Sequence, residues 1–204
     1  MGGPQESRKP VDAANAYYYS SGKRVDLVRD PDLFAVDLAR LDADSLGGVH
    51  FADAPRLRGD IILVDRTKQP GPAAAQLARL VEQGKALDVF NAGGGGAKIV
   101  VMPEVHIEVD QPAKRQQIKK LLAADRAGGV TVESPGGGRY RVKVGSGKSG
   151  DALKLANEIW EAFKPAVSHP RFLRIVPKPH TYPATASDSG RTRTHPARQR
   201  QREN

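Results

Sequence analysis

The stretch Tyr140–Trp160, YRVKVGSGKSGDALKLANEIW, decides the fold of the second half of this 204-residue chain. Polar and apolar residues alternate in RYRVKV (Arg139–Val144), which predicts a strand with one buried face. The following GDALKLANEIWEAF has one apolar stripe at helical spacing, formed by Leu153, Ala156, Ile159, Trp160 and Phe163. A strand therefore leads through a short glycine-containing turn into an amphipathic helix.

The turn between these two elements contains Gly147-Lys148-Ser149, which is how a phosphate-binding P-loop ends. A P-loop also needs a glycine five positions before Gly147, but Val142 stands there, inside the predicted strand. No later apolar run ends in an aspartate placed to hold magnesium. We therefore interpret the segment as a strand-to-helix turn with Ser149 as the helix N-cap.

Further elements on both sides complete a regular order. Glu104–Asp110 (EVHIEVD) alternates as a strand, and the next segment, QPAKRQQIKKLLAADRAG, predicts a helix with Ile118, Leu121 and Leu122 inward. Val130–Ser134 and Arg171–Val176 predict two more strands. The order βαββαβ predicts an α+β fold: a ferredoxin-like antiparallel sandwich with both helices on one face of the sheet.

The uncovered face of that sheet would be polar. If the valines and Tyr140 point inward, the alternation places His106, Glu108, Thr131, Glu133, Arg141 and Lys143 on the outer face. RNA-binding versions of this fold carry stacking aromatic residues there, and this sequence has none. The pattern disfavours RNA binding through the sheet.

The first half predicts a smaller α/β block rich in strands. Val25–Asp30 and Leu33–Leu38 alternate around Asp30-Pro31-Asp32, a turn signal, and Gly59–Asp65 is a more buried strand. Gly71–Gly84 predicts a helix, and ALDVF and AKIVVM then predict a hairpin. We expect a disordered N-terminus over 1–23, this block over 24–102, the ferredoxin-like domain over 103–179 and a disordered basic tail over 180–204.

Composition narrows the classes of function. The chain has no cysteine, and its five histidines, at 50, 106, 169, 180 and 195, lack metal-ligand spacing, so we expect no metal and no cofactor. There is no signal-peptide pattern and no apolar run near the ~20 residues of a membrane span, so a cytoplasmic location is the default and secretion stays open. Of the net charge of +9, six basic and two acidic residues lie from Pro177 on, which leaves the folded part mildly basic.

Three motifs carry a family resemblance. They are the opening strand PEVHIEVD, the helix LKLANEIWE (Leu153–Glu161), similar to Leu-Ala-Asn-x-Leu-Tyr-Glu, and AVSHPRFLRIV, similar to Val-x-x-Ala-Glu-Pro-x-Phe. With these, the second half resembles the propeptide, or inhibitor-like, domain of subtilisin-like serine proteases, and the first half resembles the extra N-terminal region of long bacterial members. The matching motif residues are Leu155, Ala156, Asn157, Trp160, Glu161, Pro170 and Phe172. The chain departs from the family at His169, where the family has an acidic residue before the proline.

The resemblance implies a mechanism. Such domains pack their open sheet face on a protease, in cis or in trans, and place the segment after the last strand in the substrate cleft, so that they template folding and inhibit. Here the segment is Pro177, Lys178, Pro179, His180, Thr181 and Tyr182. Its prolines favour an extended backbone, which lowers the ordering cost of binding in a cleft. Because proline beside a scissile bond tends to resist cleavage, the segment also predicts a persistent inhibitor or docking module rather than a single-use propeptide. The alternative is that these prolines only end the strand and open a linker.

We do not expect an enzyme. Asp188-Ser189-Gly190 followed by His195-Pro196 is similar to the catalytic aspartate motif of subtilisin-like enzymes, but no buried strand precedes it and the Ser-His-Asp triad is incomplete. The match is a coincidence or the relic of a truncated protease precursor. The alternative function is a general protein-interaction or adaptor module whose basic tail, Arg191–Arg202, contacts nucleic acid.

Overall fold

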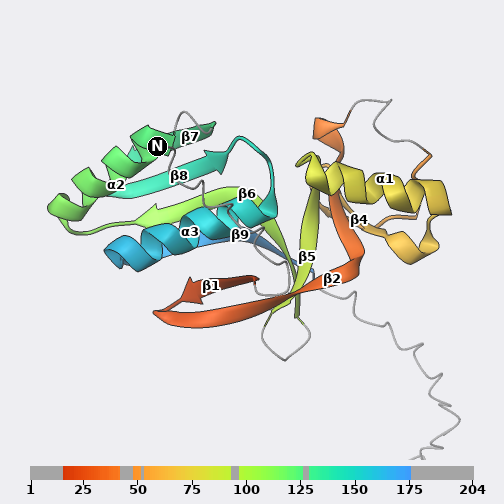
Figure 1. Ribbon diagram of the computed structural model, residues 1–204, viewed down its shortest axis with the longest axis horizontal. Coiled ribbons are helices and arrows are strands. Elements are labelled where there is room, and N and C mark those ends of the chain that lie inside the picture. The colour runs from red at the N-terminus through yellow and green to blue at the C-terminus, as the bar shows by residue number, and fades with distance from the viewer. Residues whose placement is uncertain (1–15, 42–47, 52, 93–96, 126–128, 176–204) are drawn as a thin grey trace, which may run out of the picture.

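One long strand, β6 (Ala97–Glu108), runs through the middle of the sheet and pairs with three other strands. The computed structural model describes residues 16–41, 48–51, 53–92, 97–125 and 129–175. Within them, nine strands form one curled sheet whose neighbouring strands are antiparallel, and three α-helices pack against it (Figure 1). The predicted α+β class is confirmed.

The C-terminal half follows the predicted order of elements. After β6 come α2 (Pro112–Asp125), β7 (Val130–Gly136), β8 (Arg139–Val144), α3 (Ser149–Phe163) and β9 (Val167–Ile175). The strands lie in the order β9-β6-β8-β7. Both helices cover the same face, where Ile118 of α2 and Ile159 of α3 meet Ile107 of β6 in one buried cluster. Figure 1 shows α2 and α3 together at one end of the molecule.

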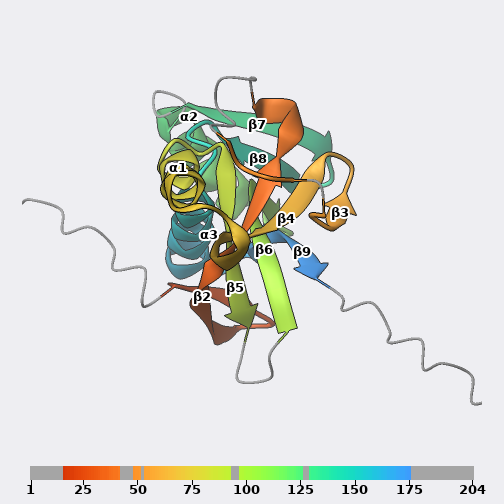
Figure 2. The ribbon, with the colours of Figure 1, turned by 90° about the vertical axis from the view of Figure 1, so that its right-hand side faces the viewer.

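The N-terminal half adds β2 (Lys23–Asp37), β3 (Arg56–Arg58), β4 (Ile61–Asp65) and β5 (Ala86–Ala92), with α1 (Gly71–Glu82) at the other end of the molecule. Leu77 and Leu80 of α1 are buried against Phe34, Val36 and Ile62, so α1 covers one face of these strands. β5 and β6 form the predicted hairpin and lie side by side in Figure 2.

The predicted turn at Asp30-Pro31-Asp32 is wrong, because β2 continues through it as one strand. The pairing with β5 shifts register between Arg29 and Phe34, so the extra residues form a β-bulge. The Asp30 carboxylate accepts the backbone N–H groups of Asp32 and Leu33, and Lys98 Nζ lies 2.6 Å from its other oxygen. A side chain thus satisfies the backbone groups that the interrupted ladder leaves unpaired.

The expected disorder before residue 24 is wrong for residues 16–23. Ala16–Ser20 forms β1, which pairs with the start of β2. Tyr18 packs on Phe172 of β9, with ring centroids 4.7 Å apart, and Tyr19 stacks on Trp160 of α3 at 5.5 Å. The sequence does not reveal this strand, because three successive tyrosines show no strand periodicity and the aromatic partners of Tyr18 and Tyr19 lie more than 140 residues away.

The predicted boundary between residues 102 and 103 lies inside β6. β9 pairs with both halves of this strand, from Lys98 opposite Ile175 to Glu108 opposite Val167. The register shifts only between Val101 and Val105, around Met102 and Pro103. The two predicted blocks therefore share a strand and are not joined by a linker at this point.

Candidate functional site

The outer face of β9-β6-β8-β7, opposite the two helices, is the largest polar feature that the sequence singled out. Val105 and Ile107 of β6 point to the helices, so the residues that alternate with them point outward. The predicted outer-face positions Glu108, Thr131, Glu133, Arg141 and Lys143 are exposed, and His106 is half-buried. This part of the prediction is confirmed.

Glu104 is the centre of an ion-pair cluster on this face. It is only 8% exposed, and its carboxylate lies 2.8 Å from His106 Nε2, 3.3 Å from Arg141 Nε and 3.4 Å from Arg171 Nη1. A carboxylate with so little access to water needs such partners, because burying an unpaired charge is costly. The cluster ties together β6, β8 and β9.

Sequence reasoning missed the burial of Glu104 and the part played by Arg171. Between the pairs Val101–Phe172 and Val105–Pro170, β6 has three residues opposite one residue of β9. Glu104 and Arg171 both lie within this irregularity. Their contact depends on the register between two distant strands, which alternation within either strand does not reveal.

The rest of the outer face carries exposed ion pairs. Glu133 lies 3.1 Å from Lys143 Nζ and 3.4 Å from Arg141 Nη1, and the hydrogen bond and charge of Lys143, followed by Arg141, lower the pKa of the Glu133 carboxyl. Arg139 Nε lies 3.5 Å from Glu108. Such exposed pairs stabilise the fold weakly, so they leave the side chains available to a partner.

A depression of about 480 Å³ lies where β6, β8 and β9 meet. Its lining includes three charged residues and two histidines: Glu108, Arg139, Arg141, His106 and His169. The rings of His106 and His169 have centroids 6.2 Å apart, and His169 Nδ1 lies 2.8 Å from the Pro170 carbonyl oxygen, to which it donates. His169, at the position where the chain departs from the resembled family, therefore belongs to the outer face.

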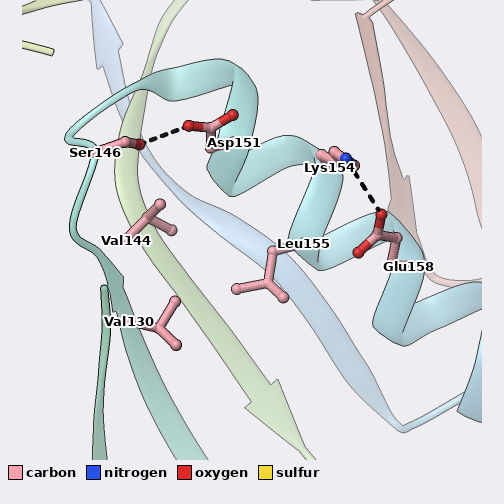
Figure 3. A pocket seen from close by; sticks show the side chains of 7 residues that line it. All are labelled: Val130, Val144, Ser146, Asp151, Lys154, Leu155 and Glu158. Carbon is pink, nitrogen blue, oxygen red and sulfur yellow. Dashed lines mark hydrogen bonds and ion pairs between the residues drawn. The ribbon is translucent and has the colours of Figure 1, made fainter. Parts of the chain in front are cut away.

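A second hollow, of about 200 Å³, lies between the ends of β7 and β8 and helix α3 (Figure 3). Val130, Val144 and Leu155 supply its apolar side. On its rim Ser146 Oγ donates to Asp151 Oδ2 at 2.6 Å, and Lys154 lies 3.8 Å from Glu158. The polar groups are thus paired with one another, and the hollow has no set of groups arranged for catalysis in the described part of the chain.

The Gly-Lys-Ser turn beside this hollow is a packing device. Ser149 is 2% exposed; its Oγ donates to the Val101 carbonyl at 2.7 Å and accepts the N–H of Asp88 at 3.3 Å. The helix N-cap is Lys148, so the predicted capping role of Ser149 is wrong: its hydroxyl satisfies groups of β5 and β6. Gly147 has φ +71°, and a Cβ there would lie 2.6 Å from the Gly84 carbonyl oxygen. Gly147 therefore allows a close approach of two backbone segments, and Ser149 makes buried hydrogen bonds within the protein.

The residues of the resembled helix motif hold β1 in place. Asn157 Nδ2 donates to the Tyr17 carbonyl at 2.9 Å, and Glu161 accepts the hydroxyls of Tyr17 and Tyr19 at 2.9 and 3.1 Å. Burial and the adjacent Glu161 carboxylate raise the pKa of Tyr17. The other motif residues also pack internally: Trp160 on Tyr19, Phe172 on Tyr18, and Leu155 and Ala156 in the core, while Pro170 is a buried residue of β9.

The predicted protease-binding segment, Pro177–Tyr182, lies outside the described residues, as do the Asp188 and His195 motif and the arginine-rich tail. β9 ends at Ile175, two residues before Pro177. Among described residues there is no group of three or more histidines or acids that could hold a metal ion. No described helix is long and apolar enough to cross a membrane.

Comparison of the chain with protein-family models, with curated proteins and with solved structures finds no match in any of the three.

Proposed function

We propose that this protein is a non-catalytic, propeptide-like module that binds a subtilisin-like serine protease and inhibits it or assists its folding. The observation that carries the proposal is the polar outer face of β9-β6-β8-β7. It is free of helices in the described part of the chain, and it is contiguous with the strand that leads to Pro177–Tyr182. The motifs of the second half support the choice of partner.

We assign the C-terminal half to the ferredoxin-like class. Supporting this are the antiparallel strand order β9-β6-β8-β7 and the position of α2 and α3 on one face, which are the features of a split βαβ arrangement. The remaining strands extend this sheet through the shared β6.

The size of the outer face explains why the trailing segment is needed. Four strands about 4.8 Å apart and about 20 Å long cover roughly 400 Å². A stable interface buries about 800 Å² on each partner. The sheet alone is therefore about half of what a stable complex needs, and Pro177–Tyr182 in the protease cleft supplies the remainder. The charged pairs of the sheet give orientation and association rate more than affinity.

The test is steady-state hydrolysis of a chromogenic peptide by bacterial subtilisin-like proteases in the presence of the full chain. We expect inhibition, with the inhibition constant raised at least ~100-fold when the chain ends at Ile175, because about half of the interface is removed. Lys143→Glu, at an exposed position outside the Glu104 cluster, should raise the inhibition constant about tenfold, since a like charge replaces a complementary one. Lys119→Glu, on the exposed side of α2, should leave it unchanged.

Three results would count against the proposal. One is a full chain that neither inhibits nor is captured by any protease of the panel. Another is a chain ending at Ile175 that inhibits as strongly as the full chain. A third is equal weakening by Lys143→Glu and Lys119→Glu, which would reflect net charge alone. Electrophoresis of the same reactions shows whether the chain persists intact, as expected, or is cleaved.

A further inference from the structure

The depression on the outer face gathers four basic side chains from three strands. His169, His106 and Arg141 are direct neighbours across β9, β6 and β8, so they form a row perpendicular to the strands. Arg139 is two residues from Arg141 on the same face, roughly 7 Å along β8. Neighbouring strands are roughly 4.8 Å apart. The four groups therefore lie close together on one face, and all four line the depression.

The two arginines keep unused donors, and each histidine ring keeps one nitrogen. Arg139 is 68% exposed, and its described contact is a 3.5 Å approach to Glu108. Arg141 directs Nε to Glu104 and Nη1 to Glu133, which leaves Nη2. His106 donates through Nε2 to Glu104 and His169 donates through Nδ1 to the Pro170 carbonyl oxygen. The other nitrogen of each ring accepts in the neutral form and donates to an anion only when the ring is protonated.

The side chains that line the depression include two arginines and one carboxylate, so positive charge exceeds negative charge there. Glu104 is nearly buried and already shared by His106, Arg141 and Arg171. Glu108 is the one carboxylate among the described lining residues. Its pairing with Arg139 is long, and both side chains are about half exposed or more, so an anion can replace it at Arg139 at little cost.

The number and spread of the donors indicate the class of anion. A carboxylate has two oxygens, which a single arginine satisfies in bidentate fashion. A tetrahedral oxyanion presents three or more oxygens in different directions and suits two arginines at a hollow, which two histidine rings join when they are protonated.

We propose that this depression binds a phosphate-type oxyanion, either free or as a phosphomonoester. The proposal goes beyond protease binding and does not rest on it, since it follows from the lining residues alone. Should both hold, the anion would occupy part of the proposed docking face and compete with the protease there.

The test is calorimetric titration of the full chain with inorganic phosphate and with O-phosphoserine at low ionic strength. We expect saturable binding of at least one of them, weakened about tenfold by Arg139→Gln, which removes a charge-assisted donor. Glu108→Gln should tighten binding, because it removes the opposing charge. Lys119→Gln changes net charge as Arg139→Gln does, but lies on α2 and should leave binding unchanged.

Equal affinity for the two ligands would identify free phosphate as sufficient, and tighter binding of phosphoserine would indicate a group carried on a larger molecule. The proposal is overturned if neither ligand binds saturably, or if Arg139→Gln and Lys119→Gln have the same effect. Because Arg139 is largely exposed, its replacement should preserve the fold, which circular dichroism of the same sample checks.

Discussion

Replacing Ser149 by alanine tests whether the Gly-Lys-Ser segment is a packing device. The Ser149 hydroxyl joins the start of α3 to β5 and β6, by donating to the Val101 carbonyl and accepting the Asp88 N–H. Ser149→Ala removes both bonds at a site that is 2% exposed. Water cannot readily replace them without opening the junction between α3 and the sheet.

The expected loss can be estimated from these two bonds. A buried donor or acceptor left without a partner costs about 1–3 kcal/mol. The 3.3 Å hydrogen bond from the Asp88 N–H is long, so its loss should cost about 1 kcal/mol, the low end of this range. Alanine has a higher helix propensity than serine, which offsets a few tenths of a kcal/mol. We expect a net loss of about 2 kcal/mol in the free energy of unfolding. For a chain of this size, that lowers Tm by about 4–8 °C.

Urea unfolding, followed by circular dichroism and by the fluorescence of Trp160, measures this change. Ser134→Ala is the matched control, because Ser134 is exposed and makes a single 3.4 Å hydrogen bond, so its loss should stay within about 0.5 kcal/mol. Ser149→Asp further distinguishes a capping role of Ser149 from a role in buried packing. An N-cap accepts aspartate about as well as serine, whereas a buried site should lose several kcal/mol on gaining a charge. The reasoning fails if Ser149→Ala matches the control or if Ser149→Asp is as stable as the wild type.

Three more perturbations test other parts of the fold by urea unfolding. Ile159→Ala, at a fully buried position of α3, should cost about 2–5 kcal/mol, and a loss below 1 kcal/mol would contradict the described core. Gly84→Ala should destabilise by more than about 1 kcal/mol, since Gly84 has φ +70° and a Cβ would collide with the Ser146 carbonyl; Gly71→Ala, in open space, should not. Burial raises the pKa of Asp30 as the largest single effect, but hydrogen bonds from Lys98 and from the N–H groups of Asp32 and Leu33 together lower it below its ordinary value. The stability due to ionised Asp30 is therefore present above the ordinary carboxyl pKa and lost as pH falls. The difference in the free energy of unfolding between wild type and Asp30→Asn should then decrease from about pH 5 downward. A difference that stays constant with pH would contradict this.

Elements whose apolar residues recur at a regular period were predictable from the sequence. Val105 and Ile107, and the stripe containing Ala156 and Ile159, have the period of their element and are buried as that period requires. β1 was not predictable in this way, because three successive tyrosines have no such period. Its burial comes from α3 and β9, which lie far along the chain. The bulge at Asp30 was mistaken for a turn because both features use an aspartate that accepts nearby backbone N–H groups.

For the candidate site, alternation predicted which side chains face outward but not which of them meet. His106, Arg141 and Glu133 were placed correctly on one face. That Glu104 is buried under Arg141 and Arg171, and that His169 lies beside His106, depends on the register of β9 against an irregular β6. The pairing of β6 with β9, about 59 to 77 residues apart along the chain, is set by the packing of the whole sheet, so it cannot be predicted from the pattern of a single sequence.

The outer face combines two kinds of ion pair that should respond differently to a partner. Glu133, Lys143, Arg139 and Glu108 are exposed enough that water screens their pairs, so exchanging these contacts for contacts with another molecule costs little. Glu104 is different, because removing Arg141 or Arg171 from it would leave a nearly buried charge with fewer partners. A bound partner should therefore rearrange the exposed pairs and leave the Glu104 cluster intact. The cluster then fixes the positions of Arg141 and His106 before binding, while the exposed pairs decide which ligand or protein is accepted.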